Sequence, residues 1–98
     1  MNFIFEITDK TGRKIYLSKE RWNHITSPSS PHSYMANYLE KVKETLSNPD
    51  KIVESIYEDS KVFYYRYYKD NGKFLRVIVK YLNGRGYVIT TYFVMNTG

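Results

Sequence analysis

The second half of the chain reads as four strand-like runs whose connections are too short for crossovers. The runs cover residues 51–57, 62–69, 73–82 and 87–95, and the turns between them are centred on Asp59-Ser60, Asn71-Gly72 and Asn83-Gly84. Connections this short join neighbouring strands that run in opposite directions, so the pattern predicts an antiparallel meander. One face of such a sheet must be covered by the rest of the chain.

The first half begins with a predicted hairpin and a short helix. Residues 3–7 and 13–17 are rich in β-branched and aromatic side chains and flank the turn-forming residues 9–12. Ser18 is placed to cap a helix over residues 19–26, in which Trp22 is the expected anchor on the core.

A longer helix is predicted after a loop that contains two prolines. From Tyr34 to Leu46 the apolar residues recur at positions i, i+3, i+4, i+7 and i+11, which is the stripe of an amphipathic helix. The element order is therefore ββααββββ. We expect an α+β fold in which two helices pack on one face of an antiparallel four-stranded sheet beside an N-terminal hairpin, all within one domain of residues 1–98.

Several classes of protein are excluded by composition. The chain has 98 residues, enough for a single domain, and no cysteine, which excludes disulfides, thiolate zinc sites and cysteine nucleophiles. No apolar run approaches the length of a transmembrane helix, and the first ten residues lack the apolar core of a signal peptide. We therefore expect a cytoplasmic protein with no membrane partner.

Positive charge is concentrated in the C-terminal part of the chain. Residues 1–60 contain 8 Lys and Arg against 9 Asp and Glu, whereas residues 61–98 contain 7 against Asp70 alone. Ten of the 17 aromatic residues also lie in residues 61–98. Cations bind phosphates and aromatic rings stack on bases, so this mixture suits single-stranded nucleic acid. A tyrosine-rich sheet with its cations on a solvated face would have the same composition.

Along each predicted strand, the more apolar row of side chains is expected to face the core. On residues 73–82 this row is Leu75, Val77 and Val79, and on the last strand it is the odd positions from Ile89 to Met95. Three-residue turns at 70–72 and 82–84 would align these rows with Phe63, Tyr65 and Tyr67. A two-residue turn at Asn83-Gly84 would instead bring Thr91 outward.

The opposite row forms the predicted outer face of the sheet. It consists of Tyr64, Arg66, Tyr68, Arg76, Lys80, Thr90 and Tyr92. Three cations among hydroxyl groups and aromatic rings would suit an anionic ligand that carries a ring. A polar, solvated sheet face without a ligand remains the alternative reading.

Four short motifs, in this order, carry a resemblance to a known family. They are Trp22-Asn23-His24-Ile25, Thr45-Leu46-Ser47-Asn48-Pro49-Asp50, Val77-Ile78-Val79-Lys80 and Ile89-Thr90-Thr91-Tyr92. From about Ile15 to Phe93 the chain resembles the barnase/EndoU/colicin/RelE-like nuclease superfamily of BECR fold, in its small phage- and toxin-associated branch. A histidine-led segment of that family is matched here by His32-Ser33-Tyr34-Met35, which lacks the expected Pro and Glu, so His32 is left out of the predicted site.

The resemblance implies RNA cleavage by attack of the ribose 2′-OH on the adjacent phosphate, with no metal or other cofactor. It places the family's helix histidine on His24, its strand lysine on Lys80, and its threonine and tyrosine on Thr90 and Tyr92. Together with the charge pattern, it gives the predicted catalytic residues His24, Arg76, Lys80 and Thr90 and the predicted substrate-binding residues Tyr64, Arg66 and Tyr92. Histidine suits proton transfer near neutral pH, and Arg and Lys suit charge stabilisation.

We therefore expect a small toxin-like endoribonuclease whose partners are RNA and an antitoxin or inhibitor protein. The alternative is a noncatalytic RNA-binding or protein-interaction module on the same fold. For His24 there is also a purely structural alternative, because this residue could pair with Glu20 one helical turn away. The position of His24 relative to Arg76 and Lys80 discriminates between these interpretations.

Overall fold

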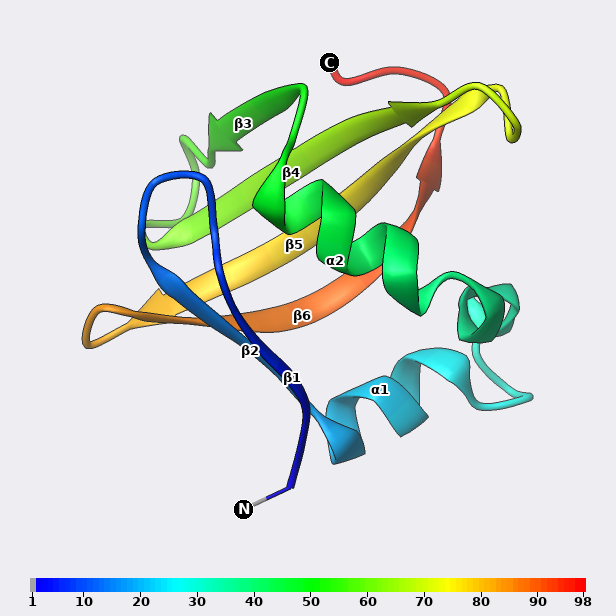
Figure 1. Ribbon diagram of the computed structural model, residues 1–98, viewed down its shortest axis with the longest axis horizontal. Coiled ribbons are helices and arrows are strands. Elements are labelled where there is room, and N and C mark those ends of the chain that lie inside the picture. Colours follow the sequence, from blue (N-terminus) through cyan, green and yellow to red (C-terminus); the bar gives the residue numbers. More distant parts are fainter. Residues whose placement is uncertain (1) are drawn as a thin grey trace.

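A computed structural model, which describes residues 2–98, shows a six-stranded mixed sheet with two α-helices on one face (Figure 1). The elements are β1 (Phe3–Thr8), β2 (Lys14–Ser18), α1 (Lys19–Thr26), the 3-10 helix η1 (Ser33–Asn37), α2 (Leu39–Ser47), β3 (Lys51–Glu54), β4 (Lys61–Tyr68), β5 (Lys73–Leu82) and β6 (Arg85–Val94). The predicted α+β class is confirmed, and η1 is an addition to the predicted order. None of the helices in residues 2–98 has the length and apolar character needed to cross a bilayer.

The N-terminal hairpin is part of the main sheet. The strand order is β1-β2-β6-β5-β4-β3, and β2 pairs in parallel with β6 through Ile15 with Gly86 and Tyr16 with Tyr87. All other strand pairs are antiparallel. The predicted four-stranded antiparallel sheet is therefore wrong in detail, because the fully buried Ile15 extends the inner face of the sheet beyond the meander.

The first helix forms as the sequence predicts. The hydroxyl oxygen of Ser18 accepts a hydrogen bond of 3.0 Å from the backbone N–H of Arg21, which caps the helix. Trp22 and Ile25 are buried on the core side of α1. The predicted anchoring role of Trp22 is confirmed.

The second predicted helix is divided at Tyr38. Residues 33–37 form the 3-10 helix η1, and α2 begins at Leu39. The division does not alter which side chains face the sheet, since Met35 in η1 and Val42 in α2 are both fully buried. The apolar stripe thus predicted the buried face correctly and the helix type only in part.

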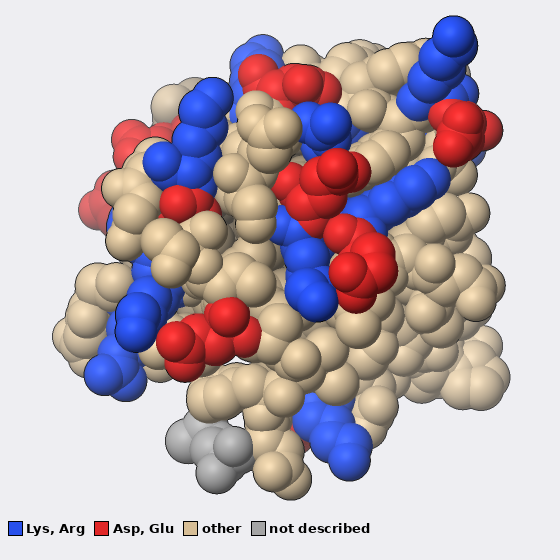
Figure 2. All heavy atoms as spheres, viewed as in Figure 1, with Lys and Arg blue, Asp and Glu red and all other residues tan. Residues whose placement is uncertain are grey.

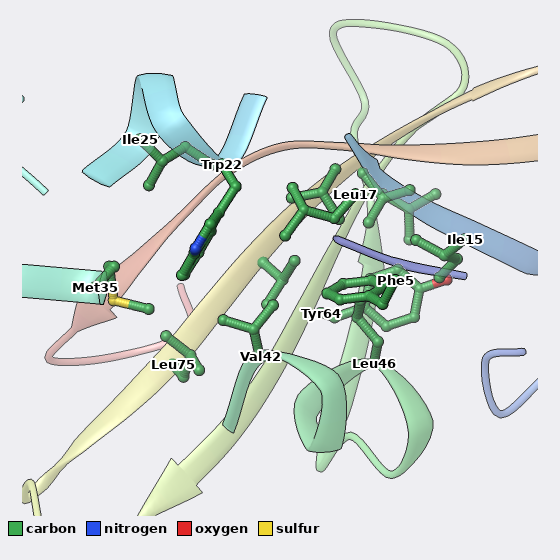
Figure 3. Close-up of a cluster of buried hydrophobic side chains, with 14 residues drawn as sticks. Phe5, Ile15, Leu17, Trp22, Ile25, Met35, Val42, Leu46, Tyr64 and Leu75 are labelled. Carbon is green, nitrogen blue, oxygen red and sulfur yellow. The ribbon is translucent and has the colours of Figure 1, made fainter. Parts of the chain in front are cut away.

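The core lies between the helices and the inner face of the sheet. Figure 3 shows Phe5, Leu46 and Tyr64 close together, with Trp22 and Leu75 farther along the same layer. The predicted inner row of β5 is confirmed, because Leu75, Val77 and Val79 are all fully buried.

On β4 the predicted faces are reversed. A four-residue turn at 69–72 pairs Tyr68 with Lys73, so Tyr65 lies opposite Arg76. The predicted outer residues Tyr64, Arg66 and Tyr68 consequently face the helices, and the predicted core residues Phe63, Tyr65 and Tyr67 lie on the opposite face. Tyr65 is nevertheless buried there, whereas Tyr67 is exposed. The expectation of a three-residue turn was wrong by one residue, which moves every side chain of a strand to the other face.

The residues of β4 that face the helices can point inward because their polar end groups form hydrogen bonds at the rim of the core. The hydroxyl of Tyr64 donates to the carboxylate of Asp9 at 2.6 Å. Arg66 donates from Nη1 to the carbonyl of Asn48, just past the end of α2, at 2.7 Å. The hydroxyl of Tyr68 likewise donates to a carboxylate of α2. The rule that the more apolar row of side chains faces the core therefore gives the wrong inner face for β4.

On β6 two departures from the expected geometry cancel. Asn83 and Gly84 form a two-residue turn with φ values of 53° and 80°, which is the backbone of a type I′ turn. The register then shifts between Ile78 and Val79, and the shift restores the pairing of Arg76 with Tyr92. Thr90 and Tyr92 therefore belong to the outer row, as predicted.

The same shift changes which residues of β6 enter the core. Val88 is 3% exposed and Thr91 is fully buried, whereas Ile89 at the irregularity is only partly buried. Met95 lies beyond the strand and is exposed. The expectation that Ile89 and Met95 occupy the core is wrong for this reason.

Candidate active site

The outer face is the face of the sheet turned away from α1 and α2. Its side chains from the three long strands are those of Lys61, Phe63, Tyr65 and Tyr67 on β4, Phe74, Arg76, Ile78, Lys80 and Leu82 on β5, and Arg85, Tyr87, Thr90, Tyr92 and Val94 on β6. Aromatic rings thus surround the two cations that β5 contributes.

Arg76 is held by tyrosines on both neighbouring strands. Its Nε donates to the hydroxyl oxygen of Tyr65 and its Nη1 to that of Tyr92, both at 3.0 Å. The guanidinium carbon also lies 5.7 Å from the ring centre of Phe63. Burial alone would lower the pKa of Arg76, but the hydrogen bonds to Tyr92 and Tyr65 outweigh it and raise that pKa. Arg76 is a fixed cation with further N–H donors for a ligand.

His32 meets this cluster from the loop between α1 and η1. Its imidazole stacks on the ring of Tyr92, with centroids 4.6 Å apart and planes inclined by 14°. The segment is anchored nearby, because the backbone N–H of Phe93 donates to the hydroxyl of Tyr34 at 3.2 Å. Within residues 2–98 the imidazole nitrogens of His32 form no hydrogen bond, so neither is engaged by another group of the protein.

Thr90 lies opposite Ile78 on the outer face, two residues before Tyr92. Two residues along a strand span roughly 7 Å, so the hydroxyl of Thr90 flanks the Arg76 cluster. It is partly exposed and can donate a hydrogen bond to a ligand held by Arg76.

Lys80 shares the outer face but lies four residues from Arg76, roughly 13 Å along β5. Its ammonium forms an ion pair of 3.1 Å with Glu58, which also pairs with Lys61 at 2.8 Å. Hydrogen bonds from Lys61 and Lys80 lower the pKa of Glu58. The positive charge of Lys80 is therefore partly balanced by the β3–β4 loop.

The structure places the remaining predicted site residues elsewhere. His24 is exposed on α1, where it lines a surface hollow with Ser18, Glu20 and Arg21. Within residues 2–98 no hydrogen bond, ion pair or ring contact joins His24 to Arg76 or Lys80. Tyr64 and Arg66 lie on the inner side of β4. Of the predicted residues, Arg76, Thr90 and Tyr92 come together, and Lys80 shares their face.

Charge on the helix-bearing side of the molecule has a different character. Figure 2 shows acidic and basic side chains interspersed there. Arg66 lies 3.5 Å from Glu44, and Lys43 lies 3.3 Å from Glu40. Because Arg66 lies on this side of the sheet, only Arg76 and Lys80 of the three predicted outer cations lie on the outer face. Across residues 2–98, no three His, Cys, Asp or Glu side chains are grouped so that they could hold a metal ion.

Three members of the cluster, Phe63, Tyr65 and His32, are not among the predicted site residues. Tyr65 was assigned to the core because the turn at 69–72 was read as one residue shorter. His32 was set aside because its segment departs from the family pattern, although its histidine is the available signal. A four-residue reading of the turn would have placed Tyr65 beside Arg76.

One of three comparisons with known proteins gives a match. A sequence profile of the phage-Barnase-EndoU-ColicinE5/D-RelE like nuclease 2 family matches residues 5–97. Searches of curated proteins and of solved structures give no significant match. The matched region includes all the strands from β2 to β6 and every residue of the outer cluster. On this match the chain belongs to the phage-Barnase-EndoU-ColicinE5/D-RelE like nucleases, the family its motifs resemble.

Proposed function

We propose that this nuclease is an endoribonuclease whose reaction centre is Arg76, His32 and Tyr92 on the outer face. The observation that supports the proposal is that Tyr92 contacts both groups. Its hydroxyl accepts a hydrogen bond from the Arg76 guanidinium, and its ring stacks on the imidazole of His32. A cation and a proton-transfer group at one place are what cleavage of a phosphodiester by its own ribose requires.

In the proposed reaction the ribose 2′-oxygen attacks the adjacent phosphorus and the bond from phosphorus to the 5′-oxygen breaks. The products are a 2′,3′-cyclic phosphate and a 5′-hydroxyl. The 2′-hydroxyl must lose a proton and the 5′-oxygen must gain one. Histidine is the residue type best suited to such transfers near neutral pH, so His32 is assigned one of them.

Arg76 is assigned the phosphate. Its planar donor fork can bind two non-bridging oxygens and stabilise the charge that develops as phosphorus becomes five-coordinate. Thr90 can donate to a phosphate oxygen, and Lys80 can bind the phosphate of a neighbouring nucleotide. No metal is needed for these steps.

The proposed substrate is single-stranded RNA. Unpaired bases expose their faces, which stack on aromatic side chains such as the half-exposed Tyr67 and its neighbour Phe74. In a cell, such an enzyme would act as a toxin on messenger RNA, tRNA or the translating ribosome in the cytoplasm. We therefore include an inhibitor protein among its proposed partners.

The test uses the two histidines of the chain as a matched pair. Wild-type protein, His32→Ala and His24→Ala are incubated with a mixed RNA pool in EDTA, and the new ends are sequenced. We expect His32→Ala to lower cleavage roughly 100-fold or more, as loss of a proton-transfer group does, and His24→Ala to cleave like wild type. Loss of activity in His24→Ala alone would move the reaction centre to α1.

Arg76 provides a second arm of the experiment. Arg76→Lys retains the positive charge and loses the planar fork, so we expect RNA to bind while cleavage falls. Wild-type protein that binds RNA and produces no new ends would refute the proposal in favour of a noncatalytic RNA-binding module.

A further inference from the structure

A cavity lies at the end of the sheet, between η1 and the β4–β5 turn. Its volume is about 370 Å³, and it is lined by Tyr34, Tyr38, Asn71, Lys73 and Phe93. None of these residues takes part in the reaction centre described above. Its chemistry nevertheless suggests a role in the same enzyme.

Three aromatic rings form much of the lining. The ring centroids of Tyr34 and Phe93 lie 6.3 Å apart with planes inclined by 26°, and Tyr38 meets Phe93 edge to face at 5.1 Å. Tyr34 is 43% exposed, so part of its ring surface is accessible to a ligand. Such a lining favours a flat, ring-shaped ligand.

Three side-chain oxygens at the edge of the cavity each already accept one hydrogen bond. The hydroxyl oxygen of Tyr34 accepts from the backbone N–H of Phe93 at 3.2 Å. That of Tyr38 accepts from Nδ2 of Asn71 at 3.3 Å. Oδ1 of Asn71 accepts from the ammonium of Lys41 at 2.8 Å. An ammonium can only donate, so this contact fixes which way the Asn71 amide points.

The side chains of the lining therefore offer a ligand mainly hydrogen-bond donors. Among residues 2–98 neither the hydroxyl hydrogen of Tyr34 nor that of Tyr38 has an acceptor. The amide of Asn71 keeps a second N–H, and Lys73 has donors alone. No carboxylate lines the cavity. A ring edge that presents acceptors is satisfied here, whereas an edge that presents an amino group would set donors against donors.

The cavity adjoins the reaction centre across the edge of β6. The rings of His32 and Tyr34 meet edge to face with their centroids 6.5 Å apart. Phe93 directly follows Tyr92 on β6, and consecutive residues of a strand point to opposite faces. A strand of RNA that crosses this edge can have a phosphate at Arg76 and the base of an adjacent nucleotide in the cavity.

Resting on the proposed ribonuclease function, we infer that this cavity is the base-specificity site and that it accepts keto bases, uracil or guanine. Uracil offers carbonyl oxygens, and guanine offers O6 and N7. On the corresponding edge adenine and cytosine present an exocyclic amino group, which would face donors here, whereas the amino group of guanine lies on its opposite edge. Cleavage therefore occurs next to a keto base.

The test measures binding separately from cleavage. Probes are short DNA oligomers with a single base, U, G, A or C, flanked by abasic deoxyribose units, which cannot be cleaved because they lack the 2′-OH. Dissociation constants are measured by fluorescence anisotropy. We expect U and G to bind roughly 3- to 10-fold more tightly than A and C, the effect of one neutral hydrogen bond gained or lost.

Asn71→Asp is the decisive variant. It keeps the shape of the side chain and the contact to Lys41, but it replaces the NH2 group and both of its N–H donors with an oxygen that can accept the hydroxyl hydrogen of Tyr38. The preference for U and G should disappear or reverse. Asn23→Asp, which adds the same charge at an exposed position of α1, is the matched control and should keep the wild-type preference.

Equal affinity for the four probes, or an Asn71→Asp preference identical to wild type with a native circular dichroism spectrum, would overturn the inference. The outcomes separate it from the proposed function. RNA ends without a keto-base bias would refute the base site and leave the ribonuclease intact. A keto preference in the probes, without any RNA cleavage, would support the base site and refute the ribonuclease.

Discussion

The imidazole of His32 and the phenol ring of Tyr92 lie almost parallel, with their centroids 4.6 Å apart, and the hydroxyl of the same tyrosine accepts from Arg76. Tyr92 thereby positions His32, which lies in a loop, relative to Arg76, which lies on β5. The position of the imidazole depends on the stack rather than on a hydrogen bond of its own.

His32→Phe separates the stacking role of this residue from its chemistry. A phenyl ring can stack on Tyr92 and leave Arg76 in place, so affinity for an uncleavable DNA oligomer should stay within a few-fold of wild type. Cleavage should fall roughly 100-fold or more, because phenylalanine transfers no proton. Anisotropy and single-turnover cleavage measure the two effects. Wild-type cleavage by His32→Phe would remove the histidine from the mechanism.

Glu58→Gln should tighten RNA binding. The carboxylate of Glu58 lies 3.1 Å from Lys80 and 2.8 Å from Lys61, and its removal leaves both ammonium groups free for phosphates. We expect higher affinity and a salt dependence steeper by about one unit, as for one added phosphate contact. Titrations between about 50 and 200 mM salt measure this. Glu20→Gln on α1 is the control, and an equal gain in that variant would show that net charge alone is responsible.

Asp9→Asn tests the buried junction between the β1–β2 turn and β4. Burial alone would raise the pKa of Asp9, but hydrogen bonds from Tyr64, Arg13 and Thr11 outweigh it and lower the pKa below 3.8. A carboxyl with a lowered pKa stabilises the fold above its unfolded value, and this stabilisation is lost as the pH falls. We expect Asp9→Asn to reduce the free energy of unfolding by about 1–3 kcal/mol at pH 7.

That difference should shrink as the pH falls below about 3.8, where the carboxylate of the unfolded chain begins to protonate, and should shrink further as the pH passes the lower pKa of the folded protein. Urea unfolding followed by circular dichroism at pH 7 and pH 3 measures it. Asp70→Asn, at an exposed turn, should leave stability unchanged. A wild-type advantage as large at pH 3 as at pH 7 would contradict the assigned role of the carboxylate.

Gly86→Ala tests the parallel junction of β2 with β6. A Cβ at Gly86 would lie 2.8 Å from side-chain atoms of Tyr81 and Val79 and 3.1 Å from Ile15. These neighbours are packed in the core, so we expect a loss of about 1–3 kcal/mol in the free energy of unfolding. Gly98→Ala, where a Cβ would meet nothing within 4 Å, is the control. An unchanged urea midpoint for Gly86→Ala would mean that the junction is looser than described.

The parts of the fold that sequence predicted well depend on local rules. The cap at Ser18 and the buried row of Leu75, Val77 and Val79 follow from residues close together in the chain. The parallel pairing of β2 with β6 does not, because it depends on which sheet edge remains free once the meander has formed. Nothing within the segment of residues 14–18 encodes that choice.

The residues of the candidate site could be predicted only where the sequence showed correctly which alternate residues of each strand face outward. Thr90 and Tyr92 were placed correctly because the tight turn at 83–84 and the register shift beside Ile78 compensate for each other. Tyr64 and Arg66 were misplaced because one residue in the turn at 69–72 reverses a whole strand. His32 reaches the site by way of a loop, and neither periodicity nor alternation governs where a loop crosses a sheet edge.

The place of β6 in the sheet also has a consequence for how the protein acquires its activity during synthesis. This strand lies between β2 and β5, so it joins the N-terminal hairpin to the meander, and it is the last of these elements to leave the ribosome. Until it emerges, Ile15 and Leu17 lack much of the sheet that buries them, and Arg76 lacks Tyr92. Contacts between such distant parts of the chain form slowly. A nascent chain that stops short of β6 therefore has neither a closed core nor the complete outer cluster around Arg76.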